Sequence, residues 1–205
     1  MSGSLDLREQ LSGPVLEVAP RLLNAVVRHG DVAVRLSEVE AYAGPDDPGS
    51  HAFRGMPRRN EVMFGPAGRL YCYFTYGMHV CANVTAGPED SASAVLLRAG
   101  EVIDGVRTAR ERRPRAPDRD LARGPARLCR ALGIALTDNG TDLADGPITL
   151  ELGEPATDVS TGPRVGLRPA ADRPWRFWIT GDPTVSPYRR HPKAAPDWEA
   201  PGGSC

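Results

Sequence analysis

Two glutamates alternate with other residues along one predicted strand, and their spacing is the first sign of chemistry in this chain. Residues 32–42 alternate between apolar and polar side chains, a pattern that predicts a β-strand in which every second residue shares a face. One face of this strand reads, in order, Val32, Val34, Leu36, Glu38, Glu40 and Tyr42. A carboxylate held on such a strand can orient a water molecule and remove its proton.

The change from apolar to acidic side chains on this face leaves three structures open. The strand leaves the core before Glu38, or a bulge turns it, or a carboxylate enters a pocket. The pattern alone favours the first structure.

Aromatic side chains suited to stacking follow in the next part of the chain. Tyr71 and Tyr73 share one face of a predicted strand pair over residues 70–84, whose turn lies near Tyr76 and Gly77. Flat rings of this kind hold a nucleic-acid base with about 1–3 kcal/mol each. Alternatively, one tyrosine belongs to the core, and Asn83 is a turn or strand-end residue.

The loop from Ala43 to Asn60 precedes these strands and is rich in Gly, Pro and Asp. A loop of this length without regular structure is uncommon in a compact domain and is usually functional or disordered, so we expect it to have a function. It contains His51, which taken alone would be a hydrogen-bonding loop residue.

The charge of the chain is unevenly distributed, although its net charge is only −1. Residues 107–130 hold nine Arg and three acidic side chains. Arginine forks match phosphate oxygens, and their binding to DNA releases counterions. This segment is therefore either a solvated helix and loop or a phosphate-facing patch.

Length and composition exclude several classes of protein. A chain of 205 residues with 40% hydrophobic residues fits one folded domain. It has no stretch of about 20 apolar residues and no apolar core of a signal peptide near its N-terminus, so we expect a soluble, cytoplasmic protein. The spacing of its four cysteines indicates reduced thiols and no zinc site, and His79 with Cys81 is weak evidence for a metal.

The remaining elements are expected from periodicity and from proline and glycine signals. A hairpin turns at residues 29–31, a short buried strand at 94–97 ends at Arg98, and a basic connector spans 113–119. Helices are predicted at 14–24, 100–112 and 124–132, and further strands at 148–152, 164–167 and 176–180.

Taken together, the order and spacing of these motifs resemble the alkyladenine (3-methyladenine) DNA glycosylase family of mammalian type. The resemblance covers residues 14–186, and its specificity comes from the combination, because each piece alone is common. The motifs are Glu38-Val39-Glu40-Ala41-Tyr42, Ser50-His51-Ala52, Arg59-Asn60, Met63-Phe64, Leu70 to Met78, Asn83, Leu96-Leu97-Arg98-Ala99, Gly124 to Cys129 and Arg164-Val165-Gly166.

The resemblance implies an enzyme that flips a damaged purine out of duplex DNA and hydrolyses its N-glycosidic bond. Glu40 matches the general base, and Arg98 and the backbone carbonyl of Val165 match the groups that hold its water. Because the resemblance places the base at Glu40, Glu38 is expected to be a surface or structural carboxylate. The positions matching the base pocket are Tyr42, His51, Tyr73 and Asn83, of which Asn83 is expected to exclude guanine. The positions expected at the DNA are Arg59, Tyr76, Met78 and Arg127, with Tyr76 filling the gap in the base stack.

The resemblance also implies an α+β fold: a single domain with a curved, mostly antiparallel sheet, flanking helices and a protruding β-hairpin. We expect the domain to span residues 1–186 and residues 187–205 to form a Pro-rich tail. The family uses no metal and no cofactor, and the expected partner is double-stranded DNA containing damaged purines, bound by a monomer without an obligate protein partner or a membrane. Two competing hypotheses are a noncatalytic nucleic-acid-binding module and a small-molecule hydrolase.

Overall fold

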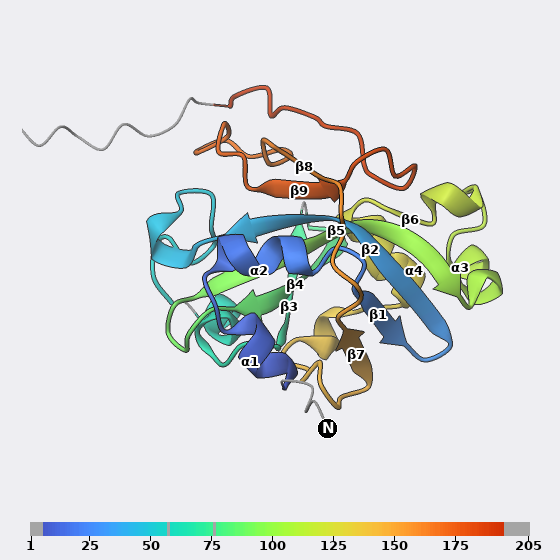
Figure 1. Ribbon diagram of the computed structural model, residues 1–205, viewed down its shortest axis with the longest axis horizontal. Coiled ribbons are helices and arrows are strands. Elements are labelled where there is room, and N and C mark those ends of the chain that lie inside the picture. Colours follow the sequence, from blue (N-terminus) through green and yellow to red (C-terminus); the bar gives the residue numbers. More distant parts are fainter. Residues whose placement is uncertain (1–5, 57, 76, 195–205) are drawn as a thin grey trace, which may run out of the picture.

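The computed structural model describes residues 6–56, 58–75 and 77–194 as one α+β domain built on a large, open and mostly antiparallel sheet (Figure 1). This confirms the expected fold class. The helices are α1 (Leu7–Leu11), α2 (Val15–Arg21), α3 (Val106–Arg112) and α4 (Pro125–Leu132), with short 3-10 turns η1 (Gly44–Asp46), η2 (Arg58–Phe64), η3 (Asp118–Asp120) and η4 (Leu136–Asp138). The strands are β1 (Val26–His29), β2 (Val32–Tyr42), β3 (Leu70–Thr75), β4 (His79–Ala86), β5 (Ser93–Asp104), β6 (Ala122–Arg123), β7 (Ile148–Glu151), β8 (Val159–Gly162) and β9 (Arg176–Ile179).

The sheet runs in the order β3-β4-β5-β2-β1-β7, and β2 lies near its centre. Strand β2 pairs with β1 at its start, with β5 along most of its length and with β9 near its end. The stretch from Glu38 to Glu40 therefore has a neighbouring strand on both sides. Both glutamates are fully buried, so the expectation that the strand leaves the core before Glu38 is wrong.

Both predicted hairpins are confirmed. Strands β1 and β2 meet at Gly30, whose φ of 60° is readily adopted by glycine. Strands β3 and β4 pair antiparallel from Leu70 to Thr75, and Gly77 has a φ of 68° in the turn between them. Tyr76, expected at the tip of this hairpin, lies outside the described residues.

Helices α2 and α4 form where the sequence predicts them, and each packs against the sheet. Proline begins α4 at its first turn, where its missing N–H costs nothing, and Gly133 ends it with a φ of 76°. The helix buries Leu128, Cys129, Ala131 and Leu132 in the same core as the apolar face of β2. Cys72, Cys81 and Cys129 are buried free thiols, as expected.

Strand β5 differs from the sequence prediction. We expected a four-residue strand and a helix from residue 100, but β5 continues to Asp104 and only residues 106–112 are helical. Residues 100–104 pair with the first half of β2, and Gly100 also pairs with Ala122 of β6. Two pairing strands stabilise the extended backbone here more than local helix propensity does, which is weak at a glycine.

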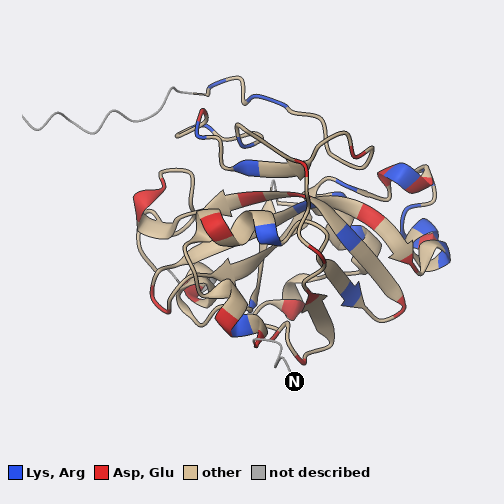
Figure 2. Ribbon diagram, viewed as in Figure 1, with Lys and Arg blue, Asp and Glu red and all other residues tan. Residues whose placement is uncertain are grey.

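Basic residues of segment 107–130 lie on α3, η3 and α4 at one end of the molecule (Figure 2). Part of this charge is neutralised locally, because Arg110 pairs with Asp118 and both Arg119 and Arg123 pair with Asp120. No helix in the described part of the chain is long and apolar enough to cross a membrane.

The C-terminal part of the chain returns to the middle of the sheet. Strand β9 pairs with β2, and the next residues bind back to it: Asp182 contacts Arg35, and Thr184 donates to Ser37 at 2.7 Å. Further along, the Gly166 N–H donates to the carbonyl of Arg189 at 3.0 Å. The expected domain boundary at residue 186 stays a prediction, and residues 195–205 lie outside the described part.

Gly100 provides a test of this arrangement. A methyl group at this position would overlap the carbonyl oxygen of Arg35 on the neighbouring strand. We expect Gly100→Ala to lower the free energy of unfolding by about 1–3 kcal/mol, as overpacking does in a core. Urea unfolding measures the change. The control Gly13→Ala places its methyl group 3.8 Å from Val18 and should leave stability nearly unchanged; equal losses in both variants would contradict the close approach.

Candidate active site

A β-bulge in β2 determines which side chains face the site. The pairing of β2 with β5 shifts register between Leu36 and Glu38 and again between Glu38 and Val39. Val34 and Leu36 lie in the main core before the bulge, and Val39 and Ala41 lie in it afterwards. Between Leu36 and Glu38, β2 has one residue more than β5, and this extra residue exchanges the two faces of the strand. Glu38 and Glu40 therefore point away from the main core instead of into it. The second structure left open by the sequence, a bulge that turns the strand, therefore occurs.

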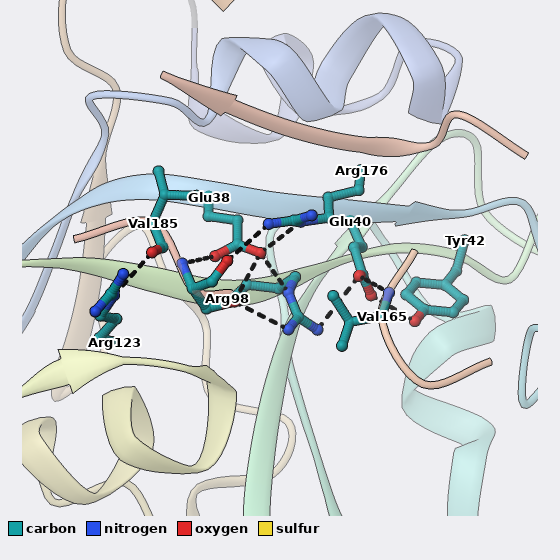
Figure 3. Close-up of polar contacts among 9 residues, drawn as sticks. Glu38, Glu40, Tyr42, Arg98, Arg123, Val165, Arg176 and Val185 are labelled. Atoms are coloured by element: carbon teal, nitrogen blue, oxygen red, sulfur yellow. Dashed lines mark hydrogen bonds and ion pairs between the residues drawn. The ribbon is translucent and has the colours of Figure 1, made fainter. Parts of the chain in front are cut away.

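Glu38 binds two arginines and the backbone of the C-terminal segment (Figure 3). Nε of Arg98 and Nε of Arg176 each donate to its Oε1 at 2.7 Å. The Ser186 N–H donates to Oε2 at 2.6 Å and the Ser186 hydroxyl to Oε1 at 2.9 Å. Burial alone would raise the pKa of Glu38, but Arg98, Arg176 and Ser186 outweigh it and hold the pKa below its usual value. Of the two roles expected for Glu38, a surface or a structural carboxylate, its burial and its contacts fit the structural one.

Glu40 is the second fully buried carboxylate, and three donors converge on it. The Val165 N–H donates to Oε1 at 2.6 Å, Nη1 of Arg98 lies 3.3 Å from the same oxygen, and the Tyr42 hydroxyl donates to Oε2 at 2.9 Å (Figure 3). Burial alone would lower the pKa of Arg98, but Glu40 and Glu38 together raise it. Arg98 is therefore a permanent cation shared by both carboxylates.

Val165 reaches Glu40 from a turn, and not from the strand expected over residues 164–167. The preceding strand, β8, ends at Gly162, and proline follows it at position 163. Gly166 has a φ of 73°, which bends the chain and allows the Val165 N–H to face the carboxylate. The resemblance implied that the backbone carbonyl of Val165 meets the water; the contact described here is made by its N–H.

Arg164 fixes this turn and also supports Tyr42. Its guanidinium is almost fully buried, bonds Asp47 through both terminal nitrogens and donates to the Ala41 carbonyl at 3.0 Å. The same group lies 4.6 Å from the centre of the Tyr42 ring and 5.0 Å from that of Trp175. Sequence reasoning missed this pair of Arg164 and Asp47, although both residues lie in segments it had singled out.

An aromatic cavity of about 80 Å³ adjoins Glu40 through Tyr42. His51 lies edge-on to Tyr73, with ring centres 4.5 Å apart, and its Nδ1 lies 3.2 Å from the Tyr71 hydroxyl. The Tyr71 and Tyr73 rings are 5.8 Å apart and nearly parallel. The cavity is lined by Tyr42, Gly49, Ser50, His51, Met63, Tyr71, Tyr73, Asn83 and Leu167. The structure therefore brings together the pocket residues named from the sequence and adds Tyr71 to them.

The polar groups of this cavity are held in place. Asn83 is nearly buried, and its side-chain amide donates to the Tyr71 carbonyl at 3.2 Å. Burial and the neighbouring Glu40 raise the pKa of Tyr42 well above 10.0, and burial and Cys81 do the same for Tyr73. Both phenols stay protonated at neutral pH, so the Tyr42 hydroxyl is a donor to Glu40.

Of the residues expected at the DNA, Met78 and Arg127 are not among those that line this cavity. Met78 follows the turn of the β3–β4 hairpin with 69% of its surface exposed, and Arg127 is exposed on the first turns of α4. Arg59 belongs to η2, but its side chain lies outside the described part, as Tyr76 does entirely. In the described residues, no group of three or more His, Cys, Asp or Glu side chains could hold a metal ion.

Comparison with known proteins identifies the family behind this geometry. The sequence model of the methylpurine-DNA glycosylase family matches residues 9–183, which include every contact described around Glu40. The chain belongs to the methylpurine-DNA glycosylase family. It is thus placed among the DNA glycosylases, enzymes that act on DNA in repair.

Bacterial relatives resemble the chain over most of its length. A protein of Nocardia farcinica is 59% identical over 86% of this chain and 88% of its own length. One of Leifsonia xyli is 55% identical over 90% and 93%, and one of Mycolicibacterium paratuberculosis is 51% identical over 97% and 98%. Each carries the name "Putative 3-methyladenine DNA glycosylase". These matches establish the glycosylase family, and the narrower mammalian type expected from the motifs is not established by bacterial relatives.

Substitution of Glu38 tests the buried ion cluster. Glu38→Gln removes the negative carboxylate with which Arg98 and Arg176 both pair. We therefore expect a loss of about 3–5 kcal/mol in the free energy of unfolding at pH 7. Because the folded pKa of Glu38 is depressed, its contribution is complete above the ordinary value of 4.5 and disappears as the pH falls through the folded pKa. The difference between parent and variant in urea unfolding should therefore shrink at acidic pH.

The control for this measurement is Glu101→Gln, which removes a carboxylate whose side chain is 54% exposed from the same sheet. Its pair with Arg35 is a surface contact, so the expected change is below about 1 kcal/mol. A Glu38→Gln variant as stable at pH 7 as Glu101→Gln would contradict the structural role of Glu38.

Proposed function

We propose that this glycosylase is monofunctional, that it flips alkylated or deaminated purines out of duplex DNA, and that it hydrolyses the N-glycosidic bond with a water molecule activated by Glu40. The observation that carries this proposal is the arrangement of Glu40. It is a fully buried carboxylate fixed by three donors, and one of these, Tyr42, also lines the aromatic cavity.

The contacts of Glu40 suggest where the water binds. In the described residues, Oε1 is approached by the Val165 N–H and Arg98, whereas Oε2 accepts only from the Tyr42 hydroxyl. A carboxylate oxygen can accept two hydrogen bonds, so Oε2 can take one from water. Since Glu40 is closed to solvent in this conformation, the water enters together with the flipped nucleotide and donates to Oε2 beside the Tyr42 hydroxyl.

The reaction then needs one proton acceptor and one departing base. Glu40 takes a proton from the water as its oxygen bonds to C1′ of the sugar, and the bond between C1′ and the purine nitrogen breaks with its electron pair going to the base. A cationic alkylpurine leaves as a neutral molecule and needs no acid. The ionised carboxylate also stabilises the positive charge that develops on the sugar, as carboxylates do in glycoside hydrolysis.

The aromatic cavity supports selection of electron-poor purines. A flipped base between Tyr42, His51 and Tyr73 gains roughly 1–3 kcal/mol of stacking per ring contact. An alkylated purine with a positive charge gains a further cation–π attraction from the tyrosine faces. Damage that weakens base pairing also lowers the energy needed for flipping. The chemistry of the cavity therefore favours 3-methyladenine and other cationic alkylpurines. Hypoxanthine and ethenoadenine are neutral, so they gain stacking and easier flipping but no cation–π attraction, and each leaves as an anion that takes a proton from solvent.

The role of Glu40 is tested by release of bases from randomly methylated duplex DNA. We expect Glu40→Gln to lower the single-turnover excision rate by at least about 100-fold, because general-base catalysis contributes this much or more. Binding of the same DNA should persist. Chromatography of the released bases gives the rate, and Glu101→Gln serves as the control because it removes an exposed carboxylate from the same sheet. Excision at the parent rate by Glu40→Gln would refute the assignment.

Asn83 is proposed to exclude guanine by contact with its exocyclic amine. The amide is nearly buried in the cavity and held by the Tyr71 carbonyl, so it cannot move aside freely. We expect Asn83→Ala to raise the release of guanine-type bases relative to hypoxanthine by about tenfold or more, the effect of about 1.4 kcal/mol. Competition between defined duplexes with one lesion each measures this ratio, and an unchanged ratio would remove Asn83 from the account of specificity.

A further inference from the structure

A buried ion pair lies against the wall of the aromatic cavity. It consists of Asp47, in the loop that follows β2, and Arg164, in the turn that follows β8, with exposed fractions of 0% and 1%. Neither is among the described residues that line the cavity. Burial alone would lower the pKa of Arg164, but the hydrogen bonds and charge of Asp47 raise it above its usual value, so the guanidinium stays charged.

Asp47 joins the loop to the end of β2 and to the turn. Its Oδ1 accepts from the Gly49 N–H at 3.0 Å, and its Oδ2 accepts from the Ala43 N–H at 3.4 Å. Both oxygens also accept from the terminal nitrogens of Arg164. Because Gly49 lines the cavity, one carboxylate determines how the loop side of the cavity lies relative to β2 and to the turn.

Arg164 joins the same loop to the residues around Glu40. Its guanidinium donates to the Ala41 carbonyl at 3.0 Å and lies 4.6 Å from the centre of the Tyr42 ring. The next residue, Val165, donates its N–H to Glu40 at 2.6 Å. Two of the three donors to Glu40 therefore belong to residues that the guanidinium or its own turn holds in place.

The loop and the turn pack closely against each other. A methyl group at Gly49 would lie 2.8 Å from Nη2 of Arg164 and 2.8 Å from Cδ1 of Leu167. Such contacts are too short for a carbon atom, so glycine allows the loop to pack directly on the ion pair. Leu167 itself lines the cavity. A displacement of the ion pair would thus be transmitted to both the loop side and the turn side of the cavity.

We propose that Asp47 and Arg164 are positioning residues for base excision, which hold β2, the loop and the turn together so that a purine in the cavity is correctly oriented to the water on Glu40. This inference rests on the proposed function. Both side chains are buried, so they act through Tyr42, Val165 and the loop and not by contact with DNA. The expected effect is on rate, because a misplacement of reacting groups by about 1 Å can lower a rate by about 100-fold.

The conservative variant Arg164→Lys tests the proposal. Lysine keeps a positive charge beside Asp47, so the fold should persist, but it lacks the planar fork that bonds both carboxylate oxygens and covers the Tyr42 ring. We expect the single-turnover excision rate at saturating methylated DNA to fall at least about tenfold through misplacement. Kd for an undamaged duplex should stay at the parent value. A parent excision rate in folded Arg164→Lys would overturn the proposal.

A second variant, Asp47→Asn/Arg164→Gln, removes both charges together. It leaves no buried ion without a partner, the change that is most destabilising, so it decides the question if Arg164→Lys does not fold. We again expect an excision rate at least about tenfold lower, with an unchanged Kd for undamaged DNA. A parent rate in this variant would show that the ion pair serves stability alone.

Arg35→Lys is the matched control. Arg35 also lies on β2 and pairs with two acidic side chains, Glu101 and Asp182, but none of its described bonds goes to a residue that lines the cavity. We expect this variant to keep the parent excision rate. An equal loss of rate in Arg35→Lys and Arg164→Lys would trace the effect to general destabilisation and contradict a positioning role.

Hydrogen exchange in the free protein separates this inference from the proposed function. The Val165 and Gly49 N–H groups are bonded to carboxylates beside the cavity. In Arg164→Lys both should exchange with solvent at least about tenfold faster than in the parent, while the amides of β5 keep their parent rates. Unchanged exchange would overturn the inference even in an active enzyme. A parent protein that releases no methylated purine would instead overturn the proposed function, and exchange would still decide whether the pair holds the loop and the turn.

Discussion

The interaction on which the site depends is the bridge that Arg98 makes between Glu38 and Glu40. Two carboxylates separated by one residue on a strand face share an environment, and here both are fully buried. Each would be strongly destabilised there without compensation, because charges removed from water need a partner and satisfied hydrogen bonds. Arg98 contacts both, and Arg176 and Ser186 complete the bonding of Glu38. Glu38 thereby orients Arg98, and Arg98 in turn presents a fixed cation to Glu40.

This bridge explains why the distant C-terminal segment is part of the site. Ser186 supplies two donors to Glu38, and the adjacent Val185 carbonyl accepts from Arg123 at 2.8 Å (Figure 3). Val165 reaches Glu40 from another turn of the same region, where Arg164 is held by Asp47. Both carboxylates therefore depend on chain segments more than 100 residues away. The position of Glu40 is determined by tertiary contacts more than by its own strand.

Tyr42 connects the two parts of the candidate site, the buried carboxylate and the aromatic cavity. Its hydroxyl bonds Glu40, its ring lines the aromatic cavity, and the Arg164 guanidinium supports that ring from 4.6 Å away. In the proposed mechanism, a base that stacks on this ring is brought next to the carboxylate. The proposal thus assigns to one side chain the coupling of base binding to catalysis, and the short spacing of Glu40 and Tyr42 in the sequence fits that assignment.

The sequence by itself determined the elements that depend on local physics. Gly30 and Gly77 mark turns with positive φ, Pro125 begins a helix, and the alternation along β2 marks a strand. The order of the motifs also sufficed to indicate the family and to name Glu40, Arg98 and the pocket residues. Local pattern failed where long-range contacts decide the outcome. Residues 100–104 pair with β2, and Gly100 also pairs with β6, so they form a strand. Residues 164–167 form no strand, and Arg164 there bonds Asp47 instead.

Only the tertiary structure decided which way the acidic face of β2 points. The alternation placed Glu38 and Glu40 on the same face as Leu36. The bulge opposite Ala99 and Gly100 lies between Leu36 and Glu38, so the two glutamates face the opposite side of the sheet from Leu36. A bulge arises from the register of two strands, and the sequence of β2 does not predict it. The same holds for the burial of the two glutamates, which is tolerated because Arg98, Arg176 and Ser186 arrive from strands and turns far along the chain. Charge compensation of this kind is a property of contacts across the fold, so it can be seen only once the chain is folded.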